Sequence, residues 1–379
     1  MPLRVLVDAT GVSADRGGLG RYVDSLVAAL DEAGADLVVV AQRTDVAAFG
    51  RLAPHAEIVP GPAVITHRAD RISWEQAGLP VLATQVRAQV LHCPSPTMPL
   101  TAPVPVVVTV HDATVFTEPG LPSAVRAEFL RAAIRTALRR ASRIMVPSGA
   151  TRDELVRLLD ADPARIDVAY HGVDQETFHP PTDAERRHVA ERLGLGDRPY
   201  IAFLGTLDPR KNAPNLIRGY VKAVAGMDAA PVLVLAGPSG YDEEVESAIA
   251  EVGHAATILR PGFLHRDDLP GFLGGALLVA CPSQAEGFGL PVLEAMACAA
   301  PVLTTPRLAL PEVGGDAVAY TEPDPESIAV VLRGLINDAE RRQLLSAAAH
   351  ARARAFTWAA SAQAHLAAYE RAVAARPHG

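Results

Sequence analysis

The sequence has few cysteines, no excess of positive charge and no long apolar run. Its three cysteines, Cys93, Cys281 and Cys298, stand at no metal-binding spacing, and the last two lie in apolar surroundings, so we expect reduced thiols. The formal net charge of −8 excludes a protein that holds nucleic acid through an overall positive field. No apolar run approaches the roughly 20 residues that a membrane-spanning helix requires.

Internal repeats and low-complexity tracts are also missing from the sequence. Residues 1–8 are predicted to form a strand of a folded domain, because their apolar run is too short and too soon interrupted for a signal peptide. Together with the reduced cysteines, this start predicts a cytoplasmic protein.

Strand-like and helix-like segments alternate along nearly the whole chain, which is typical of α/β proteins with doubly wound parallel sheets. Because 379 residues exceed the usual size of one core and 49% of them are apolar, we expect two domains. Strands are predicted at residues 4–7, 35–41, 90–93, 105–110, 143–147, 199–204, 231–236, 257–259, 277–281 and 302–304.

A segment with two prolines and a run of charges marks the predicted domain boundary. Residues 179–187 are typical of an exposed linker followed by the start of a helix. We therefore expect a first domain at residues 1–178 and a second at 179–355. Residues 356–379 have an Ala-rich helical pattern with no strand after it, so this C-terminal helix is expected to pack back toward the first domain.

The most informative segment is Glu-Gly-Phe-Gly-Leu-Pro-Val-Leu-Glu at residues 286–294, between a predicted strand and a predicted helix. Such turns bind ligands in α/β proteins. Gly287 and Gly289 leave the backbone amides uncovered, and the positive end of the helix favours phosphate or hydroxyl oxygens. Glu286 and Glu294 are candidates to accept hydrogen bonds from a sugar and a ribose. The alternative is a helix-start Glu and a surface Glu.

Two further glycine-containing turns follow the first strand of each predicted domain. Residues 16–22 carry three glycines before a helix, although not in the G-x-G-x-x-G spacing of dinucleotide binders. In the second turn, Gly205 precedes Arg210 and Lys211, which suit a diphosphate because Arg forks two oxygens and Lys supplies a mobile charge. The alternative is a solvated turn with two surface cations.

His111 follows the predicted strand at residues 105–110, so it stands at the edge where open α/β sheets hold their ligands. The alternative for a single histidine is a structural hydrogen bond.

A basic stripe of Arg131, Arg135 and Arg139 lies on the predicted helix at residues 124–143. It would suit peripheral contact with an anionic membrane at the inner face, or an anionic lipid acceptor. The alternative is a solvated helix face.

Together these segments resemble the retaining, nucleotide-sugar-dependent glycosyltransferases of family 4. These have the GT-B architecture, in which two Rossmann-like domains face each other across a cleft. The resemblance covers almost the whole chain and rests on residues 17–22, 109–112, 146–148, 171–174, 205–212 and 286–297. Trp74-Glu75-Gln76 with Leu79-Pro80, and residues 94–99, look most like mannosyltransferase-type members, which implies GDP-mannose as the donor. Departures occur at His171, where the family often has Asn, and at Gly149, where Glu is common.

The resemblance implies a role for each matching residue. Arg210 and Lys211 would bind the donor diphosphate, Glu294 the ribose, Glu286 the transferred sugar near its 3-hydroxyl, and His111 its 6-hydroxyl. The implied catalytic residues are Glu286, His111, Arg210 and Lys211. The implied donor-binding residues are Gly17, Gly18, Gly20, Gly205, Arg210, Lys211, Gly287, Phe288, Gly289, Leu290 and Glu294.

The implied reaction moves a hexose from a nucleoside-diphosphate sugar to a hydroxyl of a glycan, a lipid-linked molecule or a small molecule, with retention. The departing phosphate would help to deprotonate the acceptor, and fixed cations would stabilise the leaving group, so no metal or other cofactor is expected. Non-hydrolysing nucleotide-sugar epimerases, sugar phosphorylases and a catalytically silent nucleotide-sugar-binding protein are the alternatives, because a fold alone does not decide function.

Overall fold

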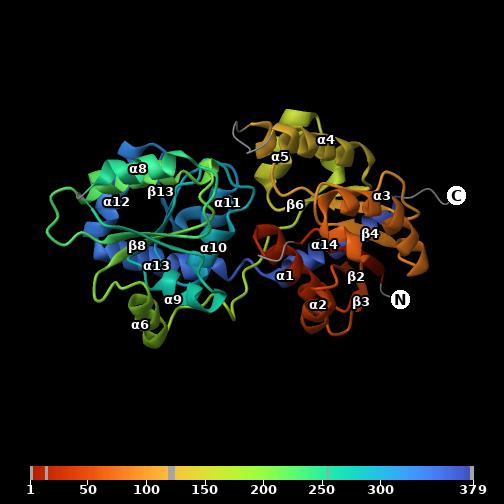
Figure 1. Cartoon of the computed structure of the whole chain (residues 1–379), viewed down its shortest axis with the longest axis horizontal. Coiled ribbons are helices and arrows are strands. Elements are labelled where there is room, and N and C mark those ends of the chain that lie inside the picture. Colours follow the sequence, from red (N-terminus) through yellow and green to blue (C-terminus); the bar gives the residue numbers. More distant parts are fainter. Residues whose placement is uncertain (1–2, 13–15, 118–123, 254–255, 376–379) are drawn as a thin grey trace. The chain divides into compact units, whose positions relative to one another are not determined.

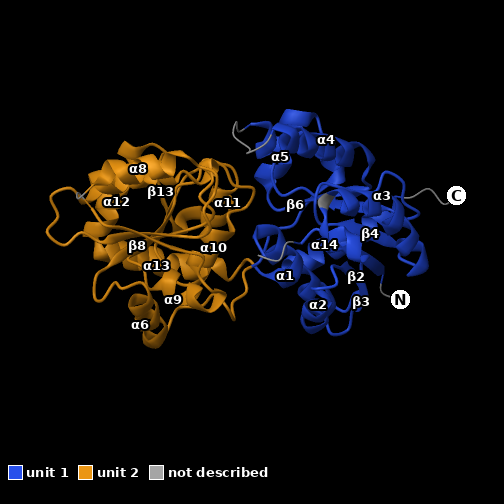
Figure 2. Ribbon diagram, in the orientation of Figure 1, with its two compact units in different colours: residues 1–172, 357–379 blue, residues 173–356 orange. Residues whose placement is uncertain are grey.

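The computed structural model describes residues 3–12, 16–117, 124–253 and 256–375, which form two compact units (Figures 1 and 2). Unit 1 comprises Met1–Gly172 and Thr357–Gly379, and unit 2 comprises Val173–Phe356. Each unit contains one parallel sheet with an apolar core on each of its two faces. This architecture confirms the expected fold class.

The sheet of unit 1 has seven strands in the order β3-β2-β1-β4-β5-β6-β7. They are β1 (Arg4–Asp8), β2 (Asp36–Ala41), β3 (Glu57–Pro60), β4 (Val90–Cys93), β5 (Val106–Thr109), β6 (Arg143–Val146) and β7 (Ile166–Val168). The chain order reverses between β1 and β4, and ligands bind outside the carboxyl ends of strands at such a switch point. Successive residues of β1 alternate between two cores, so both faces of the sheet are covered.

The helices of unit 1 include one that returns from the end of the chain. They are α1 (Gly18–Glu32), α2 (Val46–Leu52), α3 (Arg68–Gln85), α4 (Ala124–Arg140), α5 (Gly149–Leu159) and α14 (Trp358–Ala374), with the short helices η1 (Ala63–Thr66), η2 (Thr114–Phe116) and η3 (Pro163–Arg165). Helix α14, the blue helix near α1 in Figure 1, packs its buried residues into the same core as α1.

The sheet of unit 2 has six strands in the order β10-β9-β8-β11-β12-β13, with its switch point between β8 and β11. They are β8 (Tyr200–Leu204), β9 (Val232–Ala236), β10 (Ile258–Gly262), β11 (Leu278–Cys281), β12 (Val302–Thr304) and β13 (Ala319–Tyr320). The helices are α6 (Asp183–Arg192), α7 (Ala213–Val224), α8 (Glu244–Val252), α9 (Leu269–Gly274), α10 (Leu290–Ala297), α11 (Leu310–Gly314), α12 (Pro325–Asn337) and α13 (Ala339–Ala353), with η4 (Pro209–Lys211), η5 (Arg266–Asp268) and η6 (Gly315–Ala317).

The division between the units lies a few residues before the predicted boundary at residue 178. Val173 and Phe178 are buried in the core of unit 2, and the Val173 amide donates to the Phe356 carbonyl at 3.1 Å. Unit 2 therefore begins and ends where these two segments pair. Thr357 caps the N-terminus of α14 through its side chain, and the chain passes back to unit 1 at that residue.

None of the helices in the described part of the chain is both long and apolar enough to cross a membrane.

Candidate functional site

Glu286 lies in the loop between β11 and α10 of unit 2 and is surrounded by polar partners. Its side chain accepts hydrogen bonds from the Lys211 ammonium, from the Arg210 Nη1 at 2.9 Å, and from the Ser283 hydroxyl at 2.8 Å. Glu286 is 7% exposed and Lys211 8% exposed, whereas the side chain of Arg210 is one-third exposed. The structure thus brings three of the predicted catalytic side chains together at the carboxyl edge of this sheet.

The two cations keep Glu286 ionised. Burial alone would raise the pKa of this carboxyl, but the charges of Lys211 and Arg210 outweigh burial and lower the pKa to about 2. A buried carboxylate between two cations can accept hydrogen bonds from hydroxyls, and the cations can bind phosphate oxygens.

Short loops that follow two neighbouring strands hold this cluster. The Gln284 amide donates to the Arg210 carbonyl at 2.8 Å, which ties the loop after β11 to η4 after β8. The Asn212 side chain donates to the Pro282 and Pro323 carbonyls at 3.1 and 2.7 Å. Asn212 has a left-handed backbone with φ of 62°, which Asn tolerates better than most residues.

Sequence reasoning gave no role to Ser283 or Asn212, although both are buried and support the site. The signals that were available are weak. Ser283 stands three residues before Glu286, and Asn212 directly follows the two cations.

Helix α10 begins at Leu290, directly after the Gly-Phe-Gly segment, and so starts within the segment at residues 286–294 rather than near its end. Gly289 precedes its first residue, Leu290, with φ of 101°, and a Cβ at Gly289 would lie 2.8 Å from the Leu310 side chain. Glu294 lies inside the helix and is 3% exposed, so it is not a surface residue. Gly289 therefore shapes the backbone that connects Glu286 to α10.

Phe288 is buried and points into the core of unit 2, where its ring packs edge-on against Phe356 at 6.0 Å. Any contact of Phe288 with a donor would use its backbone. Gly205, at the end of β8, lies beside the Lys211 side chain, since a Cβ at this glycine would be 3.7 Å from the Lys211 Cε.

In unit 1, the glycines at residues 17–20 belong to the start of a helix rather than to an open loop. Gly17 is the residue that precedes α1, and Gly18 and Gly20 lie in its first turn, where the Arg21 amide donates to the Gly17 carbonyl at 3.0 Å. Residues 13–15 lie outside the described part of the chain. The exposed Gly17 and Gly18 leave backbone amides accessible at this helix N-terminus.

His111 stands beyond the end of β5, at the carboxyl edge of its sheet. Its Nε2 donates to the Pro94 carbonyl at 3.0 Å, and its ring packs edge-on against Tyr22 at 4.8 Å. Burial lowers the pKa of His111, so the imidazole is neutral at neutral pH and its Nδ1 is an acceptor. Within the described residues Nδ1 has no hydrogen-bond partner, which leaves it available to a ligand hydroxyl.

A buried polar network behind His111 was not expected from the sequence. The Tyr22 hydroxyl contacts His365 Nε2 at 2.8 Å and the Thr109 hydroxyl at 2.9 Å, and Thr109 contacts His92 Nε2 at 2.9 Å. Tyr369 completes the network at His92 Nδ1, at 2.8 Å. The network ties α14 to α1 and to the central strands of unit 1.

Two of the three arginines in the basic stripe on α4 are engaged within unit 1. Arg131 donates to the Val115 carbonyl at 2.8 Å, and the Arg135 guanidinium lies 5.2 Å from the centre of the Phe116 ring. These contacts attach α4 to η2, so they support a structural role for the stripe.

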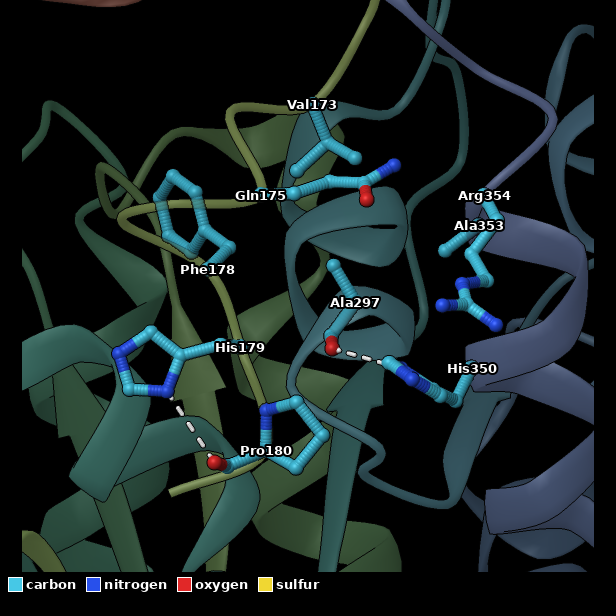
Figure 3. A pocket seen from close by; sticks show the side chains of 9 residues that line it. All are labelled: Val173, Gln175, Phe178, His179, Pro180, Ala297, His350, Ala353 and Arg354. Carbon is cyan, nitrogen blue, oxygen red and sulfur yellow. Dashed lines mark hydrogen bonds between the residues drawn. The ribbon is translucent and has the colours of Figure 1, made fainter. Parts of the chain in front are cut away.

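A small pocket of 80 Å³ lies in unit 2 at the C-terminal end of α10, away from Gly289 (Figure 3). It is lined by Val173, Gln175, Phe178, His179, Pro180, Ala297, His350, Ala353 and Arg354. None of the predicted site residues lines it. His350 Nδ1 donates to the Ala297 carbonyl at 3.0 Å and fixes one wall. In the described part of the chain, His, Cys, Asp and Glu side chains nowhere gather in threes as a metal site would require.

Two family models match the chain. The model described as "Glycosyl transferases group 1" matches residues 185–352, and the model described as "Glycosyltransferase Family 4" matches residues 16–177. The first therefore contains the Glu286 cluster and the second contains His111. Together the two matches cover most of the chain.

Curated relatives and solved structures agree with these two family matches. The chain is 31% identical over 254 residues to O-antigen chain mannosyltransferase B of Escherichia coli, covering 66% of each chain. It is 34% identical over 245 residues to D-inositol 3-phosphate glycosyltransferase of Mycobacterium marinum, covering 62% of this chain and 51% of the relative. The chain thus matches between half and two thirds of these relatives' length.

The structural similarity extends over the whole chain. Sucrose-phosphate synthase of Thermosynechococcus elongatus has a TM-score of 0.77 at 20% identity, covering 99% of this chain and 100% of that one. Anabaena HepE in complex with UDP and glucose has a TM-score of 0.72 at 19% identity, covering 95% and 97%. At these identities the similarity shows the fold.

Proposed function

Because the chain belongs to the family 4-like glycosyltransferases of the GT-B fold, we propose that it transfers a hexose from a nucleoside-diphosphate sugar to a hydroxyl acceptor, with retention of anomeric configuration. The observation that carries this proposal is the cluster of Glu286 with Arg210 and Lys211 at the switch-point edge of the unit 2 sheet. A solvated turn would not bury a lysine and a glutamate together.

The cluster suggests how the donor binds. Without a donor, Arg210 and Lys211 form ion pairs with Glu286. A donor diphosphate would compete with Glu286 for these two cations. Glu286 would then be released from part of its ion pairing and could accept hydrogen bonds from sugar hydroxyls. Glu294, behind the same loop, is the candidate for the ribose hydroxyls.

The cations would also lower the transition-state energy. As the anomeric carbon–oxygen bond breaks, negative charge grows on the leaving diphosphate and the sugar gains oxocarbenium character. Fixed positive charges and the N-terminus of α10 stabilise that state more than the ground state. We infer that this charge replaces a divalent metal and that the departing phosphate takes the proton of the acceptor hydroxyl.

GDP-mannose is the donor that we propose first. The mannosyltransferase-like segments at residues 74–80 and 94–99 and the E. coli relative's name support it. The names of the relatives also define two acceptor classes, a glycan chain and a phosphorylated cyclitol.

A donor screen with the full chain tests the function. The release of nucleoside diphosphate is measured from GDP-mannose, UDP-glucose and UDP-N-acetylglucosamine, with and without EDTA. We expect slow hydrolysis of one donor, unaffected by EDTA. Tight binding of a donor with no release in the presence of any acceptor would favour a nucleotide-sugar-binding protein instead.

A further inference from the structure

A second cluster of polar side chains lies in unit 1, where β1, β4 and α3 meet. Asp8 ends β1, and Glu75 lies on α3 opposite the loop that follows β4. Asp8 is 8% exposed and Glu75 is 4% exposed. Burial raises the pKa of Glu75, and the nearby charge of Asp8 raises it further.

Neither Asp8 nor Glu75 forms an ion pair with another residue that the structure describes. Asp8 accepts the Thr10 amide at 3.0 Å and the Thr10 hydroxyl at 2.6 Å, both at Oδ1. Its Oδ2 has no hydrogen-bond partner within the described part of the chain. This oxygen is not among the fully buried, unpartnered side-chain atoms of the described residues, so solvent reaches it and it can accept a hydrogen bond from a ligand hydroxyl.

A guanidinium with unused donors lies next to them. Arg71, one turn before Glu75 on α3, is half-buried and acts on both Asp8 and Glu75 through its charge. The Arg71 Nη1 lies close to the backbone of Gly11, because a Cβ at this glycine would be only 2.6 Å from it. Its guanidinium makes no hydrogen bond or ion pair within the residues that the structure describes.

The surrounding loop holds Glu75 in place. The Thr97 hydroxyl donates to Glu75 Oε2 at 2.7 Å, and the Gln76 side chain donates to Glu75 Oε1 at 3.1 Å. Gln76 also bonds to the Met98 carbonyl and to the Leu100 amide, both at 2.9 Å, so it fixes the loop against α3. Glu75 is thus oriented in advance and retains further lone pairs.

The cluster is continuous with the predicted catalytic edge. His111 donates to the carbonyl of Pro94, the neighbour of Ser95, and the hydroxyl of Ser95 contacts that of Thr97 at 3.1 Å. A ligand on Asp8 and Glu75 would therefore lie on the same edge of the unit 1 sheet as His111.

We propose that Asp8, Glu75 and Arg71 bind the acceptor of the transfer reaction, and that this acceptor is an uncharged sugar. The inference rests on the proposed function and specifies its second substrate. Two carboxylates accept hydrogen bonds from adjacent hydroxyls, and one guanidinium donates to a ring or hydroxyl oxygen. When both carboxylates are ionised, Asp8, Glu75 and Arg71 together carry one net negative charge, which disfavours a phosphorylated acceptor.

The test compares acceptors and variants in the full chain. Transfer from the donor that the screen identifies is measured to methyl α-D-mannoside and to D-inositol 3-phosphate. The variants are Asp8→Asn, Glu75→Gln and, as a control on the exposed face of α4, Glu128→Gln. We expect transfer to the mannoside, with its KM raised about tenfold or more in Asp8→Asn and Glu75→Gln and kcat changed less, since each loses a charge-assisted bond to a hydroxyl. Glu128→Gln should match wild type.

Two outcomes overturn the proposal. The first is D-inositol 3-phosphate as the preferred acceptor, and the second is an unchanged acceptor KM in folded Asp8→Asn and Glu75→Gln. Thermal melting checks that the variants fold, and calorimetric titration of nucleoside diphosphate should give them wild-type affinity because Arg210 and Lys211 are intact. If wild type itself neither binds the nucleoside diphosphate nor releases it from any donor, the proposed function fails rather than the acceptor assignment.

Discussion

At the scale of single residues, two buried glutamates show how neighbours decide chemistry. Lys211 and Arg210 outweigh burial at Glu286 and lower its pKa to about 2, whereas burial dominates at Glu75 and raises its pKa to about 7. The sequence could identify Glu286 as a candidate from its motif. It could not show that Lys211 and Arg210, which lie 75 and 76 positions earlier, form ion pairs with Glu286. It also gave no sign of the charge balance at Glu75.

Glu286 should make stability depend on pH in the acid range. Because its pKa falls from the ordinary 4.5 to about 2 on folding, its contribution is complete above pH 4.5 and is lost as pH falls toward 2. Glu286→Gln should remove this dependence, which amounts to on the order of 3 kcal/mol. Denaturant unfolding at several pH values measures it. The exposed Glu191→Gln serves as control, and an equal acid slope in wild type and Glu286→Gln would contradict the prediction.

Glu75 should have the opposite effect near neutral pH. Its pKa rises from 4.5 to about 7 on folding, so its contribution is complete below pH 4.5 and is lost as pH rises through 7. Glu75→Gln should therefore flatten the fall in unfolding free energy between pH 4.5 and 8, while Glu128→Gln should leave it unchanged. Chemical unfolding at several pH values in that range measures the unfolding free energy. If the free energy of Glu75→Gln falls with pH as steeply as that of wild type, Glu75 does not have the raised pKa.

At the scale of elements, the central strands were predictable, whereas three of the four edge strands in the described part of the chain were not. β4 and β12 occupy the predicted residues, because buried parallel strands are continuous apolar runs. The missed strands, β3, β7 and β13, have two to four residues and lie at or near sheet edges, where β3 is partly exposed. Such segments carry too little apolar pattern to be recognised alone.

The start of α10 should depend on glycine at residue 289. Gly289→Ala would place a side chain in a left-handed conformation and 2.8 Å from Leu310, which should cost about 1–3 kcal/mol of stability and weaken donor binding. Gly334→Ala in α12 is the matched control, because a Cβ there meets nothing within 4 Å and alanine favours a helix. Thermal melts measure the melting temperatures of both variants. Equal melting temperatures of Gly289→Ala and Gly334→Ala would show that a side chain at residue 289 does not strain the turn.

Helix α14 should be held in unit 1 by its buried hydrogen bonds as well as by packing. Tyr369→Phe removes the hydroxyl that contacts His92 Nδ1 and leaves that nitrogen buried without its partner, at a cost of about 1–3 kcal/mol. The neighbouring exposed Glu370→Gln should be neutral. Urea unfolding measures both, and no loss of stability in Tyr369→Phe would mean that the network contributes little.

At the scale of the whole molecule, length and apolar content predicted two domains, and the alternating pattern predicted parallel sheets. The packing of α14 against unit 1 was predicted from a C-terminal helical pattern with no strand after it. Packing set the division at residues 172 and 173, because Val173 and Phe178 fill the core of unit 2. The roles of the site residues came from the resemblance to a family. The supporting contacts of Ser283 and Asn212 in unit 2, and the buried network around Tyr22 in unit 1, became visible only in the structure.

The central claim is that Arg210, Lys211 and Glu286 act together on a nucleoside-diphosphate sugar. The most direct test is release of nucleoside diphosphate by wild type, Arg210→Ala and Glu286→Ala, with Arg218→Ala as control, since Arg218 makes a surface ion pair with Glu251 in the same unit. We expect the first two variants to lose activity by about a hundredfold or more and the control to retain it. Full activity in folded Arg210→Ala and Glu286→Ala would contradict the account.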